Sequence, residues 1–159
     1  MEAVVAVYSD WGIGCGGTQP IVVSADRKHF REVTGTGAVI VGRKTLADFP
    51  GGKPLKNRVN IVVTRQNMEI ENAIVAHSVE EAAEIASGYE NAYVIGGASI
   101  YKKMLPWCSK VHATVLDCAP QSDVFFPNLD ESDDWVCSDP GQWLEENGIR
   151  YRFATYERK

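Results

Sequence analysis

Five short, continuous runs of apolar residues constrain the fold of this chain most strongly. The runs are rich in Val and Ile and lack the polar alternation of a half-exposed strand; they span Ala3–Tyr8, Ala38–Val41, Val59–Thr64, Ala73–Ala76 and Tyr93–Ile95. Such runs predict strands that are covered on both faces, as in a mainly parallel sheet flanked by helices. We therefore expect an α/β fold.

Helix-compatible segments separate these runs. The expected helices span Ser24–Thr34, Arg43–Phe49, Val79–Ser87 and Ala98–Leu105. Ser24 is expected to cap the first helix, and Ser78 with Glu81 forms a capping box before the third. Pro106 directly follows the fourth and is expected to end it.

The pattern changes after Pro106. Val111–Asp117 and Arg150–Glu157 are expected to be strands, the second an antiparallel strand near a sheet edge, because its side chains alternate in polarity. Asp130–Asp134 is expected to be a solvated loop, followed by a strand over Trp135–Ser138. The sequence shows no linker, so we expect one α/β domain over residues 1–159 with an antiparallel C-terminal strand.

Charge and composition exclude several classes of protein. The chain has 159 residues and a net charge of −5, which argues against a nucleic-acid or anionic-membrane partner. The first apolar run is short and lacks a basic segment before it, which favours a strand over a signal peptide. No run approaches the roughly 18 apolar residues of a membrane helix.

The cysteines suggest neither a metal site nor a redox motif. Cys15, Cys108, Cys118 and Cys137 form no C-x-x-C pair and have no His at metal-ligand spacing. We therefore expect reduced thiols in a cytoplasmic protein without a bound metal.

Two glycine-containing stretches follow predicted strands. Gly96-Gly97 lies between a strand and a helix start, where backbone N–H groups favour phosphate, although a purely structural tight turn is equally compatible. Gly12–Gly17 follows the first strand and is either a mobile cover over a ligand or a flexible surface loop. It is not a dinucleotide fingerprint, because no helix opens at its third glycine.

Three charged residues are candidate ligand-binding groups. Asp26 in the first helical turn either complements the helix dipole or faces a cleft, where it could bind a cationic or amidine-like group beside Phe30. Arg58 and Arg65 flank a predicted strand, and their guanidinium groups would suit two different anions.

Several short motifs follow one another along the chain. They are Ile13-Gly14, Pro20, Ala25–Phe30, Thr34, Val41–Thr45, Pro54-Leu55, Arg58, Asn60–Arg65, Val94–Tyr101, Leu105-Pro106, Thr114 and Asp123–Pro127. In their order and separations they resemble the dihydrofolate reductase family over nearly the whole chain. The resemblance implies NADPH-dependent reduction of 7,8-dihydrofolate to 5,6,7,8-tetrahydrofolate, with a hydride moving to pterin C6 and a proton to N5.

On the substrate side, the resemblance implies catalytic roles for Asp26 and Thr114. Asp26 is similar to the acid that hydrogen-bonds pterin N3 and the exocyclic amino group, and Thr114 to its hydroxyl partner. Arg58 would bind the α-carboxylate of the substrate's glutamate. The other substrate-binding residues implied are Val4, Val5, Phe30, Phe49, Leu55, Ile95 and Tyr101.

On the cofactor side, Gly96, Gly97 and Ala98 resemble the turn that holds the pyrophosphate, and the family's bond between the two glycines is cis. Thr64 and Arg65 resemble the pair that meets the adenosine 2′-phosphate, which implies a preference for NADPH over NADH. The implied cofactor set is Ala6, Ile13, Gly14, Gly42, Arg43, Lys44, Thr45, Thr64, Arg65, Gln66, Ile95, Gly96, Gly97, Ala98, Ser99, Ile100 and Tyr101. Within it, backbone groups of Ala6 and Ile13 would receive the nicotinamide carboxamide.

The chain departs from the family pattern in its first loop. Ile21 follows the loop proline where the family usually has Trp, and Gln19 replaces an apolar residue. Because the family's Trp helps to order a water near the acid, these changes affect the proton route. The glycines of Gly12–Gly17 predict greater loop mobility and a larger entropic cost of closure.

Two other interpretations stay open at this stage. One is the pyrimidine reductase of riboflavin synthesis, which has the same architecture, although Asp26 with Arg58 and Thr114 argues against it. The other is a catalytically silent nucleotide-binding module. We expect a monomer that acts on a small-molecule substrate.

Overall fold

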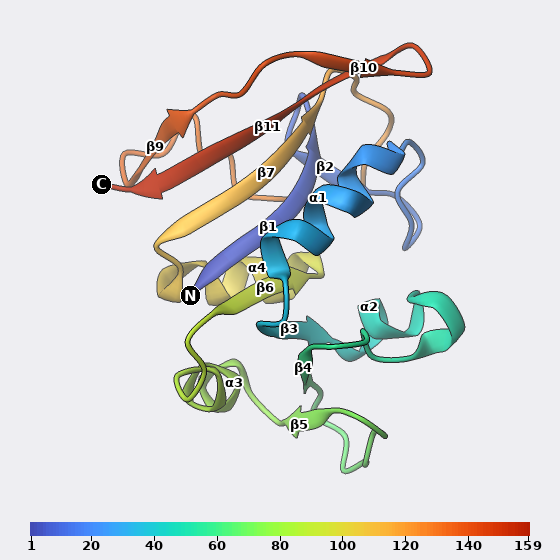
Figure 1. The fold of residues 1–159 in the computed structure, drawn as a ribbon, viewed down its shortest axis with the longest axis vertical. Coiled ribbons are helices and arrows are strands. Elements are labelled where there is room, and N and C mark those ends of the chain that lie inside the picture. The colour runs from blue at the N-terminus through green and yellow to red at the C-terminus, as the bar shows by residue number, and fades with distance from the viewer. The chain divides into compact units, whose positions relative to one another are not determined.

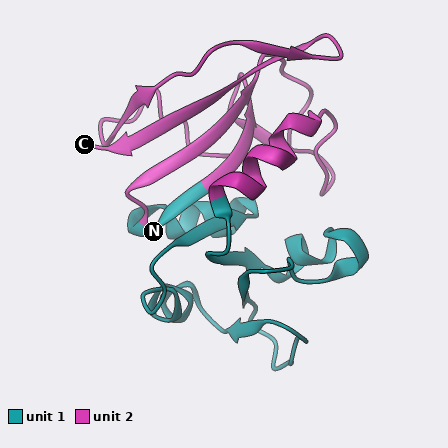
Figure 2. Ribbon diagram, viewed as in Figure 1, with its two compact units in different colours: residues 1–3, 34–107 teal, residues 4–33, 108–159 magenta.

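The protein is described here by a computed structural model that covers residues 1–159. The chain forms two compact units (Figure 2). Unit 1 comprises residues 1–3 and 34–107, and unit 2 comprises residues 4–33 and 108–159. Strand β1 (Glu2–Tyr8) contributes its first residues to unit 1 and the others to unit 2.

Unit 1 is built on parallel strands. The order is β1-β6-β3-β4-β5, with β3 at Ala38–Gly42, β4 at Val59–Val63, β5 at Ile74–Ala76 and β6 at Ala92–Gly96 (Figure 1). The side chains of Val39, Ile40 and Val41 are completely buried. This burial explains why the strands lack polar alternation, and it confirms the predicted parallel sheet.

The helices of unit 1 are α2 (Arg43–Ala47), α3 (Val79–Ala86) and α4 (Ala98–Met104), with short 3-10 turns η1 (Pro50–Gly52) and η2 (Leu105–Trp107). Helix α2 ends two residues earlier than predicted. Phe49 precedes a proline and is extended, with φ −70° and ψ 157°, because a proline ring disfavours helical geometry in the residue before it. The prediction of a cap at Ser78 is confirmed, since its hydroxyl accepts a hydrogen bond from the Glu81 N–H at 3.0 Å.

Unit 2 has the strand order β10-β11-β7-β1, and β9 also pairs with β11; the bounds are β7 Lys110–Leu116, β9 Trp135–Asp139, β10 Leu144–Glu146 and β11 Ile149–Arg158. In this order, the antiparallel pairs are those that β11 forms with β7, β9 and β10. Two short strands, β2 (Gly12–Gly14) and β8 (Val124–Phe125), pair separately. Helix α1 (Ser24–Thr34) has the predicted bounds, and all of it except Thr34 lies in this unit.

The predicted cap of α1 is wrong. The Ser24 hydroxyl does not accept a helix N–H but donates to Glu146 Oε1 at 2.7 Å. The Glu146 carboxylate accepts from the backbone N–H groups of Ser24 at 2.6 Å and Ala25 at 3.2 Å. A side chain 122 residues away therefore caps this helix, which local sequence cannot indicate.

None of the helices has the length and apolar character needed to cross a membrane.

Candidate active site

Asp26 and Thr114 are brought together in unit 2. Asp26 lies in the first turn of α1, and Thr114 lies in the middle of β7. The Thr114 hydroxyl donates a hydrogen bond of 2.6 Å to Asp26 Oδ1. Thr114 is only 1% exposed, so this bond forms away from bulk water. The two residues assigned together from the sequence are therefore direct partners.

The environment of Asp26 disfavours its ionised form. Burial raises the pKa of this carboxyl above its usual value, while the Thr114 hydrogen bond and the positive charge of His29 oppose that shift. The His29 ring stacks on Phe153 with 4.0 Å between ring centroids. Burial also lowers the pKa of His29, so its contribution weakens near neutral pH. The result is a carboxyl that is partly desolvated and has one firm donor.

Gln19 contacts the acceptor expected to receive the nicotinamide carboxamide. Its Nε2 donates to the Ala6 carbonyl at 3.3 Å. Asp123 contacts Gly14, the last residue of β2, and Gly16 beyond it. The Asp123 N–H donates to the Gly14 carbonyl, and the Asp123 carboxylate accepts from the Gly16 N–H, each at 2.9 Å. The loop that we expected to be mobile therefore includes a short strand and has two hydrogen bonds to Asp123.

In unit 1, many expected cofactor residues lie at one edge of the parallel sheet. Gly96 and Gly42 end the neighbouring strands β6 and β3, and Thr64 follows β4. The predicted cis bond between Gly96 and Gly97 is confirmed. The carboxyl ends of parallel strands are where open α/β sheets bind ligands.

The glycines at this edge allow close approach. A Cβ added at Gly97 would lie 2.7 Å from Thr45 Oγ1, and one added at Gly42 would lie 3.1 Å from Ile100 Cγ1. Gly96 has φ 127°, which favours glycine, and its position lies against the Tyr101 ring. This crowded edge fits a bound pyrophosphate that contacts backbone rather than side chains.

The residues expected at the adenosine phosphate differ in exposure. Thr64 is 7% exposed, and its hydroxyl accepts from the Gln66 N–H at 3.1 Å. Arg65 is exposed, so its guanidinium is available to an anion beside this turn. The remaining residues at this edge include exposed Lys44 and Ser99 and half-buried Arg43 and Ala98.

The Arg58 guanidinium is hydrogen-bonded to other residues of unit 1. Its Nε donates to Thr34 Oγ1 at 3.0 Å, and its Nη1 donates to the Lys56 carbonyl at 2.8 Å. The buried Asn60 side chain hydrogen-bonds both the N–H and the carbonyl of Leu55, at 3.0 and 2.9 Å. Asn60 thereby fixes the segment that leads to Arg58.

The apolar residues expected at the substrate divide between the units. Unit 2 contains Val4 and Val5, each 5% exposed, and half-buried Phe30; unit 1 contains half-buried Phe49 and Leu55, with Ile95 at 9% and Tyr101 at 7% exposed.

Comparison with known proteins identifies the family. A family model described as dihydrofolate reductase matches residues 1–158. The chain belongs to the dihydrofolate reductase family. The dihydrofolate reductase of Bacillus subtilis (strain 168) is 35% identical over 150 residues, covering 92% of this chain and 88% of that protein. The dihydrofolate reductase of Staphylococcus haemolyticus is 33% identical, covering 99% and 95%.

The fold of this dihydrofolate reductase family member also matches a solved structure. It is similar to a dihydrofolate reductase from Enterococcus faecalis complexed with NADP(H) and RAB-propyl, with a TM-score of 0.87, 33% identity, and coverage of 99% of this chain and 95% of that one. A bifunctional dihydrofolate reductase-thymidylate synthase of Daucus carota is 38% identical over 99% of this chain. The chain spans about a third of the length of the plant bifunctional relatives that it matches.

Sequence reasoning did not find several supporting residues of this family member. No local pattern in the sequence predicts the contacts that His29, Glu146 and Asp123 make with residues far along the chain. The one available signal was at Asn60, a polar residue within an otherwise apolar strand, which indicates a buried hydrogen-bonding role.

Proposed function

We propose that the protein catalyses the NADPH-dependent reduction of 7,8-dihydrofolate to 5,6,7,8-tetrahydrofolate. The observation that carries this proposal is the hydrogen bond of 2.6 Å between Thr114 and the buried Asp26 in a chain of the dihydrofolate reductase family. A desolvated carboxylate with a fixed hydroxyl neighbour is suited to bind an amidine-like edge through paired charge-assisted hydrogen bonds.

Asp26 has two tasks in this proposal. Its carboxylate accepts hydrogen bonds from pterin N3 and the exocyclic amino group, and Thr114 fixes the orientation of that carboxylate. Its negative charge also favours protonation of N5, whether or not Asp26 passes the proton itself. Burial supports the second task, because an electrostatic effect is larger where water is excluded.

Arg58 is proposed to bind the α-carboxylate of the substrate's glutamate. Thr34 and Lys56 already hold the guanidinium, so little side-chain freedom is lost on binding. A planar fork suits a carboxylate better than an ammonium group does. Val4, Val5, Phe30, Phe49, Leu55, Ile95 and Tyr101 are proposed to contact the apolar parts of the substrate.

The sheet edge of unit 1 is proposed to hold the cofactor. Bound NADPH supplies the hydride that adds to pterin C6. Gly96, Gly97 and Ala98 bind the pyrophosphate through backbone groups, and Thr64 with Arg65 binds the 2′-phosphate. The other proposed contacts come from Gly42–Thr45, Gln66, Ser99, Ile100, Ile13 and Gly14. The Ala6 carbonyl receives the carboxamide after Gln19 releases it.

We also propose that residues 1–159 form a single domain that acts as a cytoplasmic monomer without a nucleic-acid partner. The net charge of −5 supports the last point, since phosphate backbones require a basic face. Light scattering of the purified protein should give the mass of one chain, and a dimer mass would contradict this proposal.

Purified protein with dihydrofolate and NADPH tests the proposed reaction through the loss of NADPH absorbance. We expect oxidation that requires dihydrofolate and is much slower with NADH. A parallel assay uses the pyrimidine intermediate of riboflavin synthesis. Turnover of that pyrimidine alone would favour the other reductase, and cofactor binding without turnover of either substrate would indicate a silent module.

A further inference from the structure

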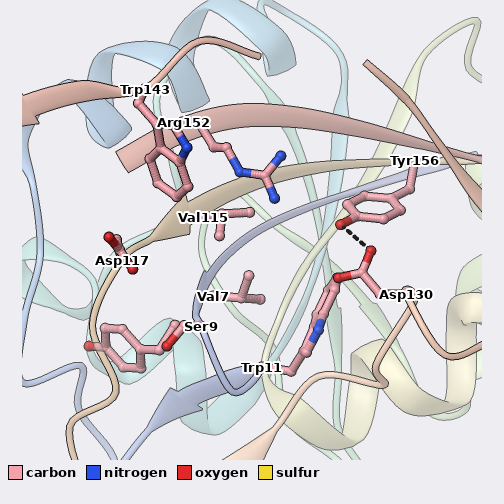
Figure 3. A pocket seen from close by; sticks show the side chains of 10 residues that line it. Val7, Ser9, Trp11, Val115, Asp117, Asp130, Trp143, Arg152 and Tyr156 are labelled. Carbon is pink, nitrogen blue, oxygen red and sulfur yellow. Dashed lines mark hydrogen bonds between the residues drawn. The ribbon is translucent and has the colours of Figure 1, made fainter. Parts of the chain in front are cut away.

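Unit 2 contains a pocket away from Asp26. It has a volume of about 180 Å³ and lies over strands β1, β7 and β11 (Figure 3). The lining residues are Val7, Tyr8, Ser9, Trp11, Val115, Asp117, Asp130, Trp143, Arg152 and Tyr156. The floor is thus aliphatic, the sides are largely aromatic, and Arg152 is the cation among these residues.

Strand register places this pocket on the opposite sheet face from Asp26. Val115 pairs with Arg152, and the adjacent Thr114 pairs with Phe153. Because side chains alternate along a strand, Val115 and Arg152 share one face, whereas Thr114 shares the other with Phe153. The Asp26 contact belongs to the Thr114 face. The pocket is therefore distinct from the site proposed for dihydrofolate.

Arg152 has an incompletely used guanidinium. Its Nη1 donates to the Pro140 carbonyl at 2.8 Å, and its Cζ lies 5.2 Å from the centre of the Trp143 ring. Its Nε is buried and has no hydrogen-bond partner. Nε and Nη2 form one edge of the guanidinium, and such an edge matches the two oxygens of a carboxylate.

The two carboxylates in the lining already have partners. Asp130 accepts a hydrogen bond of 2.8 Å from the Tyr156 hydroxyl, and burial raises the pKa of Tyr156, which keeps this donor protonated. Asp117 lies 3.5 Å from Nη1 of Arg150. Their negative charges disfavour a multiply charged anion more strongly than a singly charged one.

We propose that this pocket binds a small organic monocarboxylate with a flat apolar body. Its carboxylate accepts hydrogen bonds from the Nε–Nη2 edge of Arg152 once a shift of that side chain opens the buried Nε to the pocket, and its body lies over Val7 and Val115 beside the Trp143 ring. Figure 3 shows the Arg152 and Trp143 side chains on the same side of this pocket, with Val7 and Val115 between them and Trp11. The ligand thus satisfies a buried donor that the chain leaves unpaired.

Benzoate is a suitable probe in NMR titrations of the full chain labelled with nitrogen-15. We expect saturable shifts of the Arg152 Nε–H and the Trp143 indole N–H. Benzamide keeps the ring but lacks the charge, and phthalate adds a second charge; each should bind at least about tenfold more weakly, as expected for loss of a charge-assisted hydrogen bond or for added repulsion.

Arg152→Gln should weaken benzoate binding by about tenfold or more, and Arg152→Lys should do the same because it retains the charge without the two-donor edge. Arg31→Gln is the matched control, because it removes the same charge at an exposed position of α1 that does not line the pocket. It should keep the wild-type affinity. Absence of saturable shifts in the wild type, equal binding of benzamide, or unchanged binding in both Arg152 variants would overturn the proposal.

Discussion

The Asp26 carboxyl combines burial with a single short hydrogen bond from Thr114. Burial raises its pKa, so the folded chain holds the proton of this residue more tightly than the unfolded chain does. An apolar residue would avoid that cost. Asp26 therefore favours ligand binding at the expense of the stability of the folded chain. One variant can test its effect on turnover and its effect on the free energy of unfolding separately.

Asp26→Asn should lower turnover of dihydrofolate at neutral pH by about 100-fold or more, the range lost when a positioned acid–base group is removed. The amide oxygen can still accept from Thr114, so the local structure is expected to persist. Steady-state NADPH oxidation measures the effect. The control is Asp123→Asn, outside the proposed catalytic pair, which shows how much turnover is lost when the Gly12–Gly17 loop is less ordered. Full turnover in Asp26→Asn would refute the assigned role.

The same variant should stabilise the protein without ligands. Because the pKa of Asp26 is raised on folding, its contribution favours the folded state at low pH and is lost as pH rises through the folded pKa. At neutral pH, Asp26→Asn removes a desolvated charge and should raise the free energy of unfolding on the order of 1 kcal/mol. Urea titrations at pH 7 and near pH 3 test this; the gain should shrink at the lower pH. A loss of stability at pH 7 would contradict the argument.

At the scale of elements, sequence predicted what local chemistry determines. The five strands of the parallel sheet and the bounds of α1 follow from apolar periodicity, although β5 is partly exposed, with Ile74 at 37%. The end of α2 was predicted two residues too late, because the effect of Pro50 on Phe49 was not taken into account. Strands β2 and β8 were missed because each has only two or three residues and they pair with each other from distant parts of the chain. Strand β10 was also missed, although it forms a hairpin with β11 through Asn147-Gly148, which is a local turn signal. Asp26 and Thr114 were paired through family resemblance, since no local pattern connects residues 88 positions apart.

The N-terminus of α1 gives a test of such a distant contact. Glu146 on β10 accepts from the Ser24 hydroxyl and from the N–H groups of Ser24 and Ala25. These bonds lower the pKa of Glu146, so its stabilisation is present above the unfolded pKa and is lost as pH falls through the folded pKa.

Glu146→Gln should lower the urea midpoint at pH 7, and this difference should decrease in acid. Amide exchange at Ser24 and Ala25 should also become faster. Glu145→Gln is the matched control, because Glu145 is the exposed neighbour on the same strand. Equal effects of the two substitutions, or a larger difference in acid than at pH 7, would show that the cap is not important for α1.

At the scale of the whole molecule, the chain contains two compact units, and the proposed site residues occur in both. Most proposed NADPH contacts belong to unit 1. If residues 1–159 unfold as one domain, a ligand bound mainly by unit 1 residues stabilises every part of the chain equally against global unfolding. Amide exchange distinguishes this behaviour from independent unfolding, because it reports each unit separately.

NADPH at 100 times its dissociation constant should slow exchange of the most protected amides by about 100-fold, equivalent to about 2.7 kcal/mol. We expect the same factor for β3 and β4 in unit 1 and for β7 and β11 in unit 2, and a smaller factor for NADH at the same concentration. Arg65→Gln should reduce the difference between the cofactors, whereas Arg31→Gln, at an exposed position of α1, should not. Slowing confined to β3 and β4 would contradict the single domain, and equal slowing by NADH would contradict the role of Arg65. Cooperative unfolding and cofactor preference are thus separated in one experiment, because the first depends on which amides respond and the second on which cofactor is added.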